Sequence, residues 1–331
     1  MPDISLSNGK KFMAASGSSI LDAATQAQVA LPYSCKSGRC SSCKCKVVSG
    51  ETLALTAELG LTQEEREQGW ILSCVRSAQT DLVLEVDDLG SVELPPTKTS
   101  PCRISHIERL APDVVRVILR LPPAAMFTFL PGQYIDVIGP NGVRRSYSLA
   151  NAPATDKTLE LHIRAVKGGV MSDYWFNQAK ENDLLRLNGP LGTFFLRETS
   201  GQDLVFLATG TGIAPVKAML EALAALPQDQ QPASVTVLWG GRTPADIYID
   251  LPSLPGHYQF VPVLSRADED WAGAKGYVHE VLLQRAADLS HTTVYACGSD
   301  AMIHSARKVL VAAGLPARQF YADAFVSSGN I

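Results

Sequence analysis

Four cysteines in the first eighty residues have the side-chain type and the spacing that hold an iron–sulfur cluster. Cys35, Cys40 and Cys43 form a C-x4-C-x2-C pattern, and Cys74 lies further along the chain. Four thiolates at this plant-type spacing bind a [2Fe–2S] cluster. We therefore predict that these four cysteines are its metal ligands.

Two other uses of clustered cysteines fit this pattern less well. Structural zinc is usually held by two short Cys/His pairs, and a disulfide framework belongs to small secreted domains. The segment from Ser34 to Cys43 is rich in serine and contains Gly38, which suits a loop that turns backbone N–H groups toward sulfur. Cys45 and Cys102 are interpreted as ordinary cysteines.

A cation, an aromatic ring and a hydroxyl lie close together on one predicted strand. Arg145, Tyr147 and Ser148 supply the three features that an anionic, planar cofactor needs. Alone this motif is weak, because Arg and Tyr on a strand are usually surface residues. A nearby Gly-rich entry into a helix strengthens it, since a helix N-terminus suits a pyrophosphate. The neighbouring candidates for binding that cofactor are His162, Arg164, Gly169, Met171 and Ser172.

A glycine-rich turn follows an apolar strand in the last third of the chain. Gly210, Thr211 and Gly212 precede Pro215, which stands in the first turn of a predicted helix. The glycines permit close approach of the backbone to a phosphate, and proline suits the start of a helix. The full dinucleotide fingerprint is not present, because Pro215 stands where Gly or Ala is expected. A phosphate site and a plain strand–helix turn both remain open.

Two further candidates lie near the C-terminus. Cys297 and Gly298 follow the predicted strand 294–296, and ligands of parallel sheets bind at the carboxyl ends of strands. A small, soft side chain there suits the border of a nicotinamide ring, whereas the alternative is a buried core cysteine. Phe325 has two interpretations as well, either a core residue or a cover for one face of a flavin.

Length and composition indicate a multidomain chain. It has 331 residues, of which 46% are hydrophobic, enough for two or three domains with cores of their own. The net charge of −4 lies in residues 1–94, which hold 8 basic and 12 acidic side chains. An acidic face steers a basic docking partner, although a solvated surface explains the same charge.

Composition also excludes some classes of partner. No basic stripe indicates nucleic acid, and no apolar run of about eighteen residues indicates a membrane span. The first residues do not have the features of a signal peptide. We therefore expect a cytoplasmic protein, because seven cysteines suit a reducing compartment.

Residues 1–94 are predicted to form a small α+β domain. An Asn8-Gly9 turn between two short strands indicates a tight hairpin. Ser19 and Thr62 each begin a helix through a capping pattern. Alternating apolar residues at 82–86 predict a closing strand.

After residue 94 the sequence pattern indicates a linker and then two further domains of different structural type. Residues 95–101 contain three prolines and are predicted to be a linker. In 102–200, alternating apolar residues predict several short strands, hence an antiparallel β-barrel, with one helix at 170–179. In 201–331, apolar strands alternate with helical patterns, which predicts a doubly wound parallel sheet. The predicted strands of that sheet are 204–208, 235–239, 260–264 and 294–296.

Taken in order, these motifs resemble the flavin-dependent iron–sulfur reductases, in which a plant-type ferredoxin precedes a ferredoxin–NADP reductase-like pair of domains. The resemblance covers nearly the whole chain. It implies a multidomain α+β and α/β fold. Its parts are a β-grasp-type [2Fe–2S] ferredoxin domain at 1–94, an FAD-binding barrel at 102–200 and an NAD(P)-binding domain at 201–331.

The resemblance also implies roles for individual residues. The Arg-x-Tyr-Ser motif binds FAD, and the Ser148 hydroxyl meets the flavin. The turn at 210–215 holds the phosphates of the nicotinamide nucleotide, and Cys297-Gly298 borders its ring. Ser148, Cys297 and Phe325 are therefore the candidate catalytic residues.

Two further residues bear on the choice of nucleotide. Arg242 and Arg266 follow two strands of the nucleotide domain, where a ribose is bound, and arginine there favours a 2′-phosphate. Family members with a similar Gly-x-Arg often use NADH. We expect NADH, with NADPH as the alternative.

The implied activity is electron transfer from NAD(P)H through FAD and the cluster to a partner protein. A hydride carries two electrons and a ferredoxin cluster accepts one, so FAD is the converter. Reductases of aromatic and phenol oxygenases share much of the pattern, so an oxygenase component is one possible acceptor. A ferredoxin-like carrier without enzyme activity would need only residues 1–94. Five segments instead favour members that serve a pyridoxamine-phosphate-dependent dehydrase carrying a CDP-hexose: 33–36, 132–136, 144–151, 192–195 and 323–326.

Overall fold

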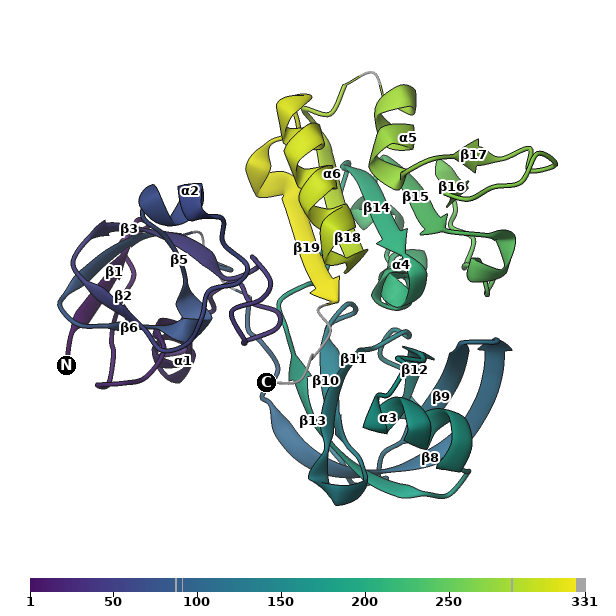
Figure 1. Ribbon diagram of the computed structural model, residues 1–331, viewed down its shortest axis with the longest axis horizontal. Helices are drawn as coiled ribbons and strands as arrows, with labels where there is room; N and C mark the ends of the chain where they lie inside the picture. The colour runs from purple at the N-terminus through teal and green to yellow at the C-terminus, as the bar shows by residue number, and fades with distance from the viewer. Residues whose placement is uncertain (87, 91, 287, 326–331) are drawn as a thin grey trace. The chain divides into compact units, whose positions relative to one another are not determined.

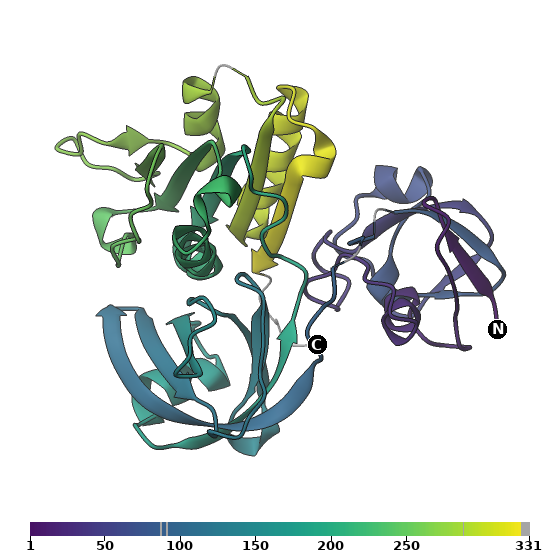
Figure 2. The same cartoon turned by 180° about the vertical axis from the view of Figure 1, so that it is seen from behind.

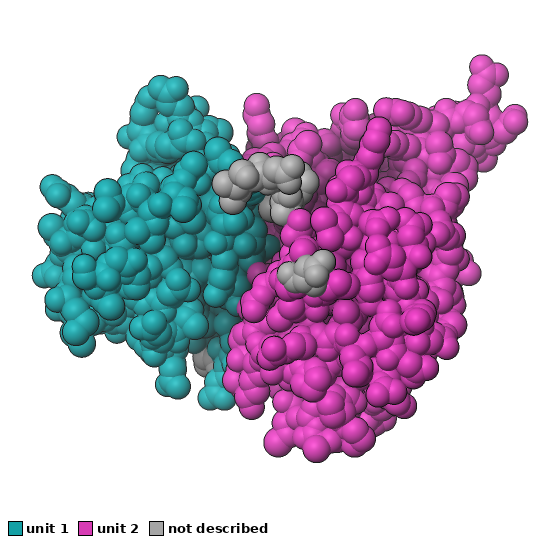
Figure 3. Space-filling view, turned by 60° about the horizontal axis from the view of Figure 1, so that its bottom comes forward, with its two compact units in different colours: residues 1–94, 326–331 teal, residues 95–325 magenta. Residues whose placement is uncertain are grey.

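The computed structural model describes residues 1–86, 88–90, 92–286 and 288–325. The chain divides into two compact units, Met1–Leu94 and Pro95–Phe325 (Figure 3). Each of the three large sheets has a hydrophobic core of its own. No helix in the described part of the chain is long and apolar enough to cross a membrane.

The first unit is built on a five-stranded mixed sheet with the strand order β2-β1-β7-β3-β5, beside a small sheet of β4 and β6. Strand β1 pairs antiparallel with β2 and parallel with β7. The elements are β1 (Asp3–Leu6), β2 (Lys11–Met13), α1 (Ile20–Gln26), β3 (Lys44–Ser49), β4 (Thr52–Ala54), α2 (Gln63–Glu67), β5 (Trp70–Leu72), η1 (Ser73–Val75), β6 (Arg76–Ala78) and β7 (Leu82–Glu85).

Local signals account for most of these elements. The Asn8-Gly9 turn joins β1 to β2, and Ser19 Oγ accepts a hydrogen bond from the backbone N–H of Asp22 at the start of α1 (3.0 Å). Thr62 and Glu65 form a reciprocal capping box at α2. These capping predictions are confirmed.

The position of β7 differs from the prediction. It lies at the centre of the sheet between β1 and β3 rather than closing its edge. Leu82 and Leu84 are almost completely buried there. Alternation of apolar residues along a strand predicts which of its faces is buried. It does not show which other strands pair with it, so the predicted edge position of β7 was wrong.

The second unit begins with a six-stranded antiparallel sheet of order β11-β10-β13-β8-β9-β12. Strands β11 and β12 are not paired along their length; they meet at a bridge between Leu149 and Leu161. The predicted barrel is therefore a curled sheet that is joined only locally at its edges. Its elements are β8 (Lys98–Ala111), β9 (Val114–Arg120), β10 (Tyr134–Ile138), η2 (Pro140–Gly142), β11 (Arg144–Ser148), β12 (Thr158–Arg164), α3 (Val170–Asp173), the π-helical turn η3 (Tyr174–Gln178) and β13 (Leu184–Leu191).

Strand β8 takes in part of the predicted linker. It begins at Lys98, and Pro101 lies opposite Arg186 of β13. Pairing of β8 with β9 starts only at Arg103, so Pro101 has a neighbouring strand on one side. A proline is tolerated there because it lacks only the N–H that a second neighbour would require.

The remainder of the second unit is a six-stranded parallel sheet of order β17-β16-β15-β14-β18-β19. The chain winds outward in both directions from β14 and β18, as a doubly wound sheet requires. Helix α6 lies in front of β18 and β19 in Figure 1 and behind them in Figure 2. The elements are β14 (Asp203–Thr209), η4 (Gly210–Gly212), α4 (Ile213–Ala224), η5 (Gln228–Gln230), β15 (Ser234–Gly241), η6 (Pro244–Asp246), β16 (Tyr258–Leu264), β17 (Ala274–Lys275), α5 (Val278–Arg285), β18 (Thr292–Ser299), α6 (Asp300–Ala312), η7 (Ala317–Gln319) and β19 (Phe320–Phe325).

Candidate cluster, flavin and nucleotide sites

The structure arranges the four predicted cluster ligands as two close pairs. The sulfur atoms of Cys35 and Cys40 lie 3.0 Å apart, and the thiols of Cys43 and Cys74 are hydrogen-bonded to each other. The backbone N–H groups of Ser37 and Cys40 both point at Cys35 Sγ, each at 3.4 Å. Backbone donors aimed at sulfur stabilise thiolate ligands, so this donor set fits a [2Fe–2S] cluster.

Electrostatics within the cysteine group favour one thiolate in each pair, because the pKa of Cys35 and of Cys74 is lowered whereas that of Cys40 and of Cys43 is raised. The hydrogen bond from the Cys40 thiol lowers the pKa of Cys35 to about 4 and raises the pKa of Cys40 itself. The contact between Cys43 and Cys74 lowers the pKa of Cys74 in the same way. Among residues 1–86, 88–90, 92–286 and 288–325, no three His, Cys, Asp or Glu side chains converge on one metal position. Two pairs of thiols, one for each iron, are what a four-cysteine binuclear cluster requires.

A second loop covers the cysteine loop and fixes its shape. A Cβ at Gly38 would lie 2.6 Å from Ala57 O, and one at Gly60 would lie 2.6 Å from Cys40 O. Ser41 Oγ donates to Gly60 O (2.7 Å). These approaches are too close for any residue but glycine, and Gly38 also has a positive φ of 71°.

The sequence analysis missed a buried carboxylate that anchors this region. Glu58 accepts hydrogen bonds from the backbone N–H of Leu72 and from the Arg76 guanidinium, both at 2.7 Å. These contacts hold the chain on both sides of Cys74. Cys45 lies in strand β3 opposite Ile71 and is buried in the core, and burial raises its thiol pKa to about 12.

The Arg-x-Tyr-Ser motif forms β11, as predicted. Arg145 and Tyr147 lie on the same face, and the Tyr147 hydroxyl accepts a hydrogen bond from Trp175 Nε1 (2.9 Å). Burial raises the pKa of Tyr147 to about 12. Arg145 Nη1 donates to the carbonyl of Arg144 (2.7 Å), and its side chain is half-exposed.

Ser148 ends the strand in a buried position. Its backbone lies opposite Tyr134 of β10. The Ser148 side chain is only 8% exposed. A buried hydroxyl at the end of the strand that also carries a half-exposed cation fits an anionic flavin nucleotide.

Two residues that are predicted to bind the flavin cofactor make contacts with other protein groups. His162 Nε2 lies 2.7 Å from Glu160 Oε1, and Nδ1 lies 3.2 Å from the Tyr248 hydroxyl. Arg164 Nη2 lies 3.1 Å from Asp246 Oδ1. Both ring nitrogens of His162 are therefore already used. Burial is the main cause that lowers its pKa, so the ring is neutral near pH 7.

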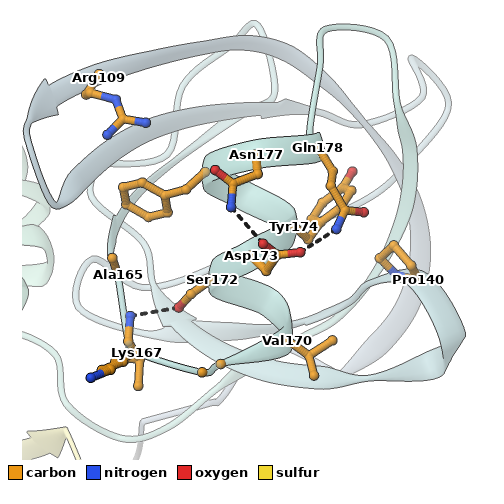
Figure 4. A pocket seen from close by; sticks show the side chains of 14 residues that line it. Arg109, Pro140, Ala165, Lys167, Val170, Ser172, Asp173, Tyr174, Asn177 and Gln178 are labelled. Carbon is orange, nitrogen blue, oxygen red and sulfur yellow. Dashed lines mark hydrogen bonds between the residues drawn. The ribbon is translucent and has the colours of Figure 1, made fainter.

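The glycine-rich entry into α3 borders a pocket of about 670 Å³ (Figure 4). Gly169 and Ser172 line it, whereas the Arg-x-Tyr-Ser motif does not, and Met171 is buried. Ser172 Oγ accepts from Val166 N (2.9 Å), and Asp173 accepts from the side-chain amide of Asn177 (2.7 Å). Ser172 and Asp173 therefore both have hydrogen-bond partners within the protein.

The nucleotide turn lies between β14 and β18, where the order of the strands along the parallel sheet reverses. It follows β14, and Cys297-Gly298 belongs to the neighbouring strand β18. A Cβ at Gly212 would lie 2.3 Å from Cys297 O, and one at Gly298 would lie 2.3 Å from Thr209 Oγ1. The N–H of Ser299 donates to that same hydroxyl (3.0 Å). The structure thus brings both predicted nucleotide segments together at the carboxyl ends of two strands, which fits a nucleotide site.

The C-terminal strand β19 brings two residues to this end of the sheet, and the sequence analysis proposed a role for only one of them, Phe325. Asp323 lies opposite Cys297 in the ladder, and both side chains are buried. Phe325 lies opposite Ser299 at the end of the strand and is 39% exposed, so its ring is not fully packed in the core. Arg242 and Arg266 are exposed at the ends of β15 and β16, where Arg266 N donates to Arg242 O (3.0 Å).

Comparison with known proteins agrees with this arrangement. Family models match a 2Fe-2S iron-sulfur cluster binding domain at 5–79, an oxidoreductase FAD-binding domain at 101–196 and an oxidoreductase NAD-binding domain at 206–308. The CDP-6-deoxy-L-threo-D-glycero-4-hexulose-3-dehydrase reductase of Yersinia pestis is 43% identical over 97% of both chains. The xylene/toluene monooxygenase electron transfer component XylA of Pseudomonas putida is 33% identical over 96% of this chain and 91% of its own.

A solved structure shows the same likeness over the full length. The Amycolatopsis cytochrome P450 reductase GcoB is 31% identical, with a TM-score of 0.77 over 99% of this chain and 100% of its own. Three domains in the predicted order, with their ligand and nucleotide segments assembled, account for a [2Fe–2S] cluster, FAD and a nicotinamide nucleotide in one chain. The chain therefore belongs to the flavin-dependent iron–sulfur reductases and is an NAD(P)H-dependent electron-transfer oxidoreductase.

Proposed function

We propose that this reductase delivers electrons to a pyridoxamine-phosphate-dependent dehydrase that carries a CDP-hexose intermediate. This is the CDP-6-deoxy-Δ3,4-glucoseen reductase step of deoxysugar synthesis. The observation that carries the proposal is the 43% identity to the Yersinia pestis dehydrase reductase, which extends over nearly all of both chains.

Each part of the chain has a separate task in this proposal. The bound FAD converts the two-electron supply from NADH into single electrons for the cluster. Arg145 holds the cofactor's phosphates, and the Ser148 hydroxyl offers a hydrogen bond to its ring system. The turn at 210–215 binds the nucleotide phosphates through backbone N–H groups at the start of α4. Cys297 presents a neutral thiol at the nicotinamide, because burial raises its pKa well above the ordinary value.

A second acceptor is supported by a separate observation. The Pseudomonas putida relative, 33% identical to this chain, is named as the electron transfer component of a monooxygenase. An oxygenase component is therefore the alternative partner. Both partners take single electrons from the same cluster, so the cofactor sites do not separate them.

A reconstitution experiment distinguishes the two acceptors. The holoprotein is mixed with NADH and either a CDP-hexulose dehydrase with its CDP-sugar or an aromatic monooxygenase component with its hydrocarbon. We expect NADH consumption coupled to formation of the 3-deoxy sugar. Turnover with the oxygenase alone, with no deoxysugar product, would assign the chain to oxygenation. Repeating the assay with NADPH tests the nucleotide preference for NADH.

The compartment is part of the same proposal. All seven cysteines are free, including three that are not in the cluster group. Free thiols persist in a reducing environment, which supports a cytoplasmic location. Fractionation of cells that express the tagged chain tests this directly.

A further inference from the structure

One face of strand β12 contacts the nucleotide-binding sheet and its connections. Glu160, His162 and Arg164 alternate along the strand and therefore point the same way. Glu160 Oε2 lies 3.1 Å from Lys217 Nζ of α4. His162 and Arg164 contact residues that follow β15, as described above. Each of the three side chains thus has a partner in the nucleotide-binding part of the second unit.

The contact of His162 continues to the nucleotide turn. The Tyr248 ring packs edge-on against His162 (ring centroids 5.6 Å apart) and against Trp239 (5.1 Å). Trp239 is completely buried, and its Nε1 donates to the carbonyl of Gly210 at 3.0 Å. A series of direct contacts therefore runs from a strand of the flavin-binding sheet to the first residue of the turn.

A second set of contacts joins α4, the helix that follows the same turn, to residues just after Ser148. Lys217 Nζ donates to Ala150 O (3.0 Å) and to Glu221 Oε1 (2.6 Å). Glu221 Oε2 accepts from the backbone N–H of Ala152 (2.8 Å). Ala150 and Ala152 directly follow the flavin motif, whereas Lys217 and Glu221 lie on α4, the helix that begins at the turn. The flavin strand and the nucleotide helix are therefore tied together by side chains.

We propose that His162, Tyr248 and Lys217 are positioning residues that set the place of the nucleotide turn relative to the flavin motif. Hydride transfer needs reacting atoms about 3–3.5 Å apart, and a displacement of about 1 Å costs about 100-fold in rate. These residues act through the turn and α4 and touch neither cofactor. The inference rests on the NAD(P)H reductase activity and is independent of which protein accepts the electrons.

The Tyr248→Phe variant tests the first series of contacts. It keeps both ring contacts and removes only the hydroxyl that donates to His162 Nδ1. Tyr258→Phe is the matched control, because the buried Tyr258 hydroxyl has no hydrogen-bond partner among the described residues. Each purified holoprotein is assayed for NADH-dependent reduction of ferricyanide, FAD content and amide hydrogen exchange at 210–214.

For Tyr248→Phe we expect kcat to fall about tenfold, with KM for NADH within about twofold of wild type. Exchange at 210–214 should be faster both with and without FAD, whereas FAD content should be unchanged. Tyr258→Phe should match wild type in all three measurements. Unchanged kcat and exchange in Tyr248→Phe would overturn the proposal, as would an equal effect in the control.

Lys217 provides an independent test of the second set of contacts. Lys217→Met should lower kcat and speed exchange at 210–214, and Lys217→Arg should recover most of both, because it keeps the charge. A third variant, His162→Gln, separates positioning from direct ligation. Loss of FAD affinity in this variant, with normal exchange at 210–214, would show that His162 is a flavin ligand and would refute its positioning role.

Discussion

Cys297 and Asp323 lie opposite each other in the β18–β19 ladder, and both side chains are buried. Burial, and then the carboxylate of Asp323, raise the pKa of the Cys297 thiol well above its ordinary value. The thiol is therefore neutral near pH 7. A substitution at this position therefore tests the packing of the side chain and not the loss of a charge.

If Cys297 borders the nicotinamide as proposed, Cys297→Ala should lower kcat for NADH-dependent ferricyanide reduction about tenfold, because the ring loses a packing surface. Since the wild-type thiol does not ionise, the ratio of the two kcat values should be constant between about pH 6 and pH 9. Steady-state kinetics at several pH values check this. A ratio that rises with pH would mean that a thiolate contributes.

Cys40→Ser should abolish the cluster and leave FAD bound. The four cysteines lie in the first unit, whereas the flavin motif lies in the second. The variant should still reduce ferricyanide with NADH but should not reduce a one-electron protein acceptor. Iron analysis and the visible spectrum measure the two cofactors separately, and joint loss of iron and FAD would contradict this modular arrangement.

Arg145→Ala should weaken FAD binding. A charge-assisted hydrogen bond to phosphate contributes about 1.5–3 kcal/mol, which corresponds to about a tenfold or greater loss of affinity. The neighbouring Arg144→Ala is the matched control, because Arg144 points to the opposite face of β11. Fluorescence titration of the apoprotein with FAD compares the two variants, and similar affinities would show that the motif has been misassigned.

Phe325→Ala should change nucleotide binding with little effect on stability. The ring is 39% exposed, so its truncation should cost less than the roughly 3–5 kcal/mol typical of a core phenylalanine. If the ring covers the flavin face that the nicotinamide must occupy, KM for NADH and the preference over NADPH should both change. A large fall in melting temperature with unaltered kinetics would instead indicate a purely structural role.

Acid should destabilise the second unit through His162. Burial lowers the pKa of this ring in the folded state, whereas the unfolded chain takes up its proton near pH 6.5. Stability is therefore lost as the pH falls below about 6.5, where the unfolded state binds more protons. The melting temperature should fall more between about pH 7.5 and pH 5.5 in wild type than in His162→Gln. His279, whose pKa is also lowered by burial, is the same in both proteins.

Features encoded by neighbouring residues were predicted well. The spacing of the cysteines identified a group that the structure assembles, and Ser19 and Thr62 cap the helices that their patterns indicated. Such signals are local, because a capping side chain bonds to a backbone group only three residues away. The alternating residues of β9 and β12 identified those strands for the same reason.

Features that depend on distant segments were not predicted. His162 and Arg164 follow a cofactor motif in sequence, yet their partners Tyr248 and Asp246 lie more than eighty residues away. No pattern in the neighbouring residues predicts a contact between such distant segments. Asp323 was missed for a similar reason, since only the pairing of β18 with β19 shows that it lies beside Cys297.

Strand β19 is the outermost strand of the parallel sheet, and it pairs with β18 alone. A chain cut before Phe320 would keep the glycine turn and Cys297 but would leave β18 as an exposed edge of apolar residues. Unpaired edges of this kind recruit strands from other molecules. Loss of β19 would therefore expose a new edge strand and favour aggregation of the truncated chain.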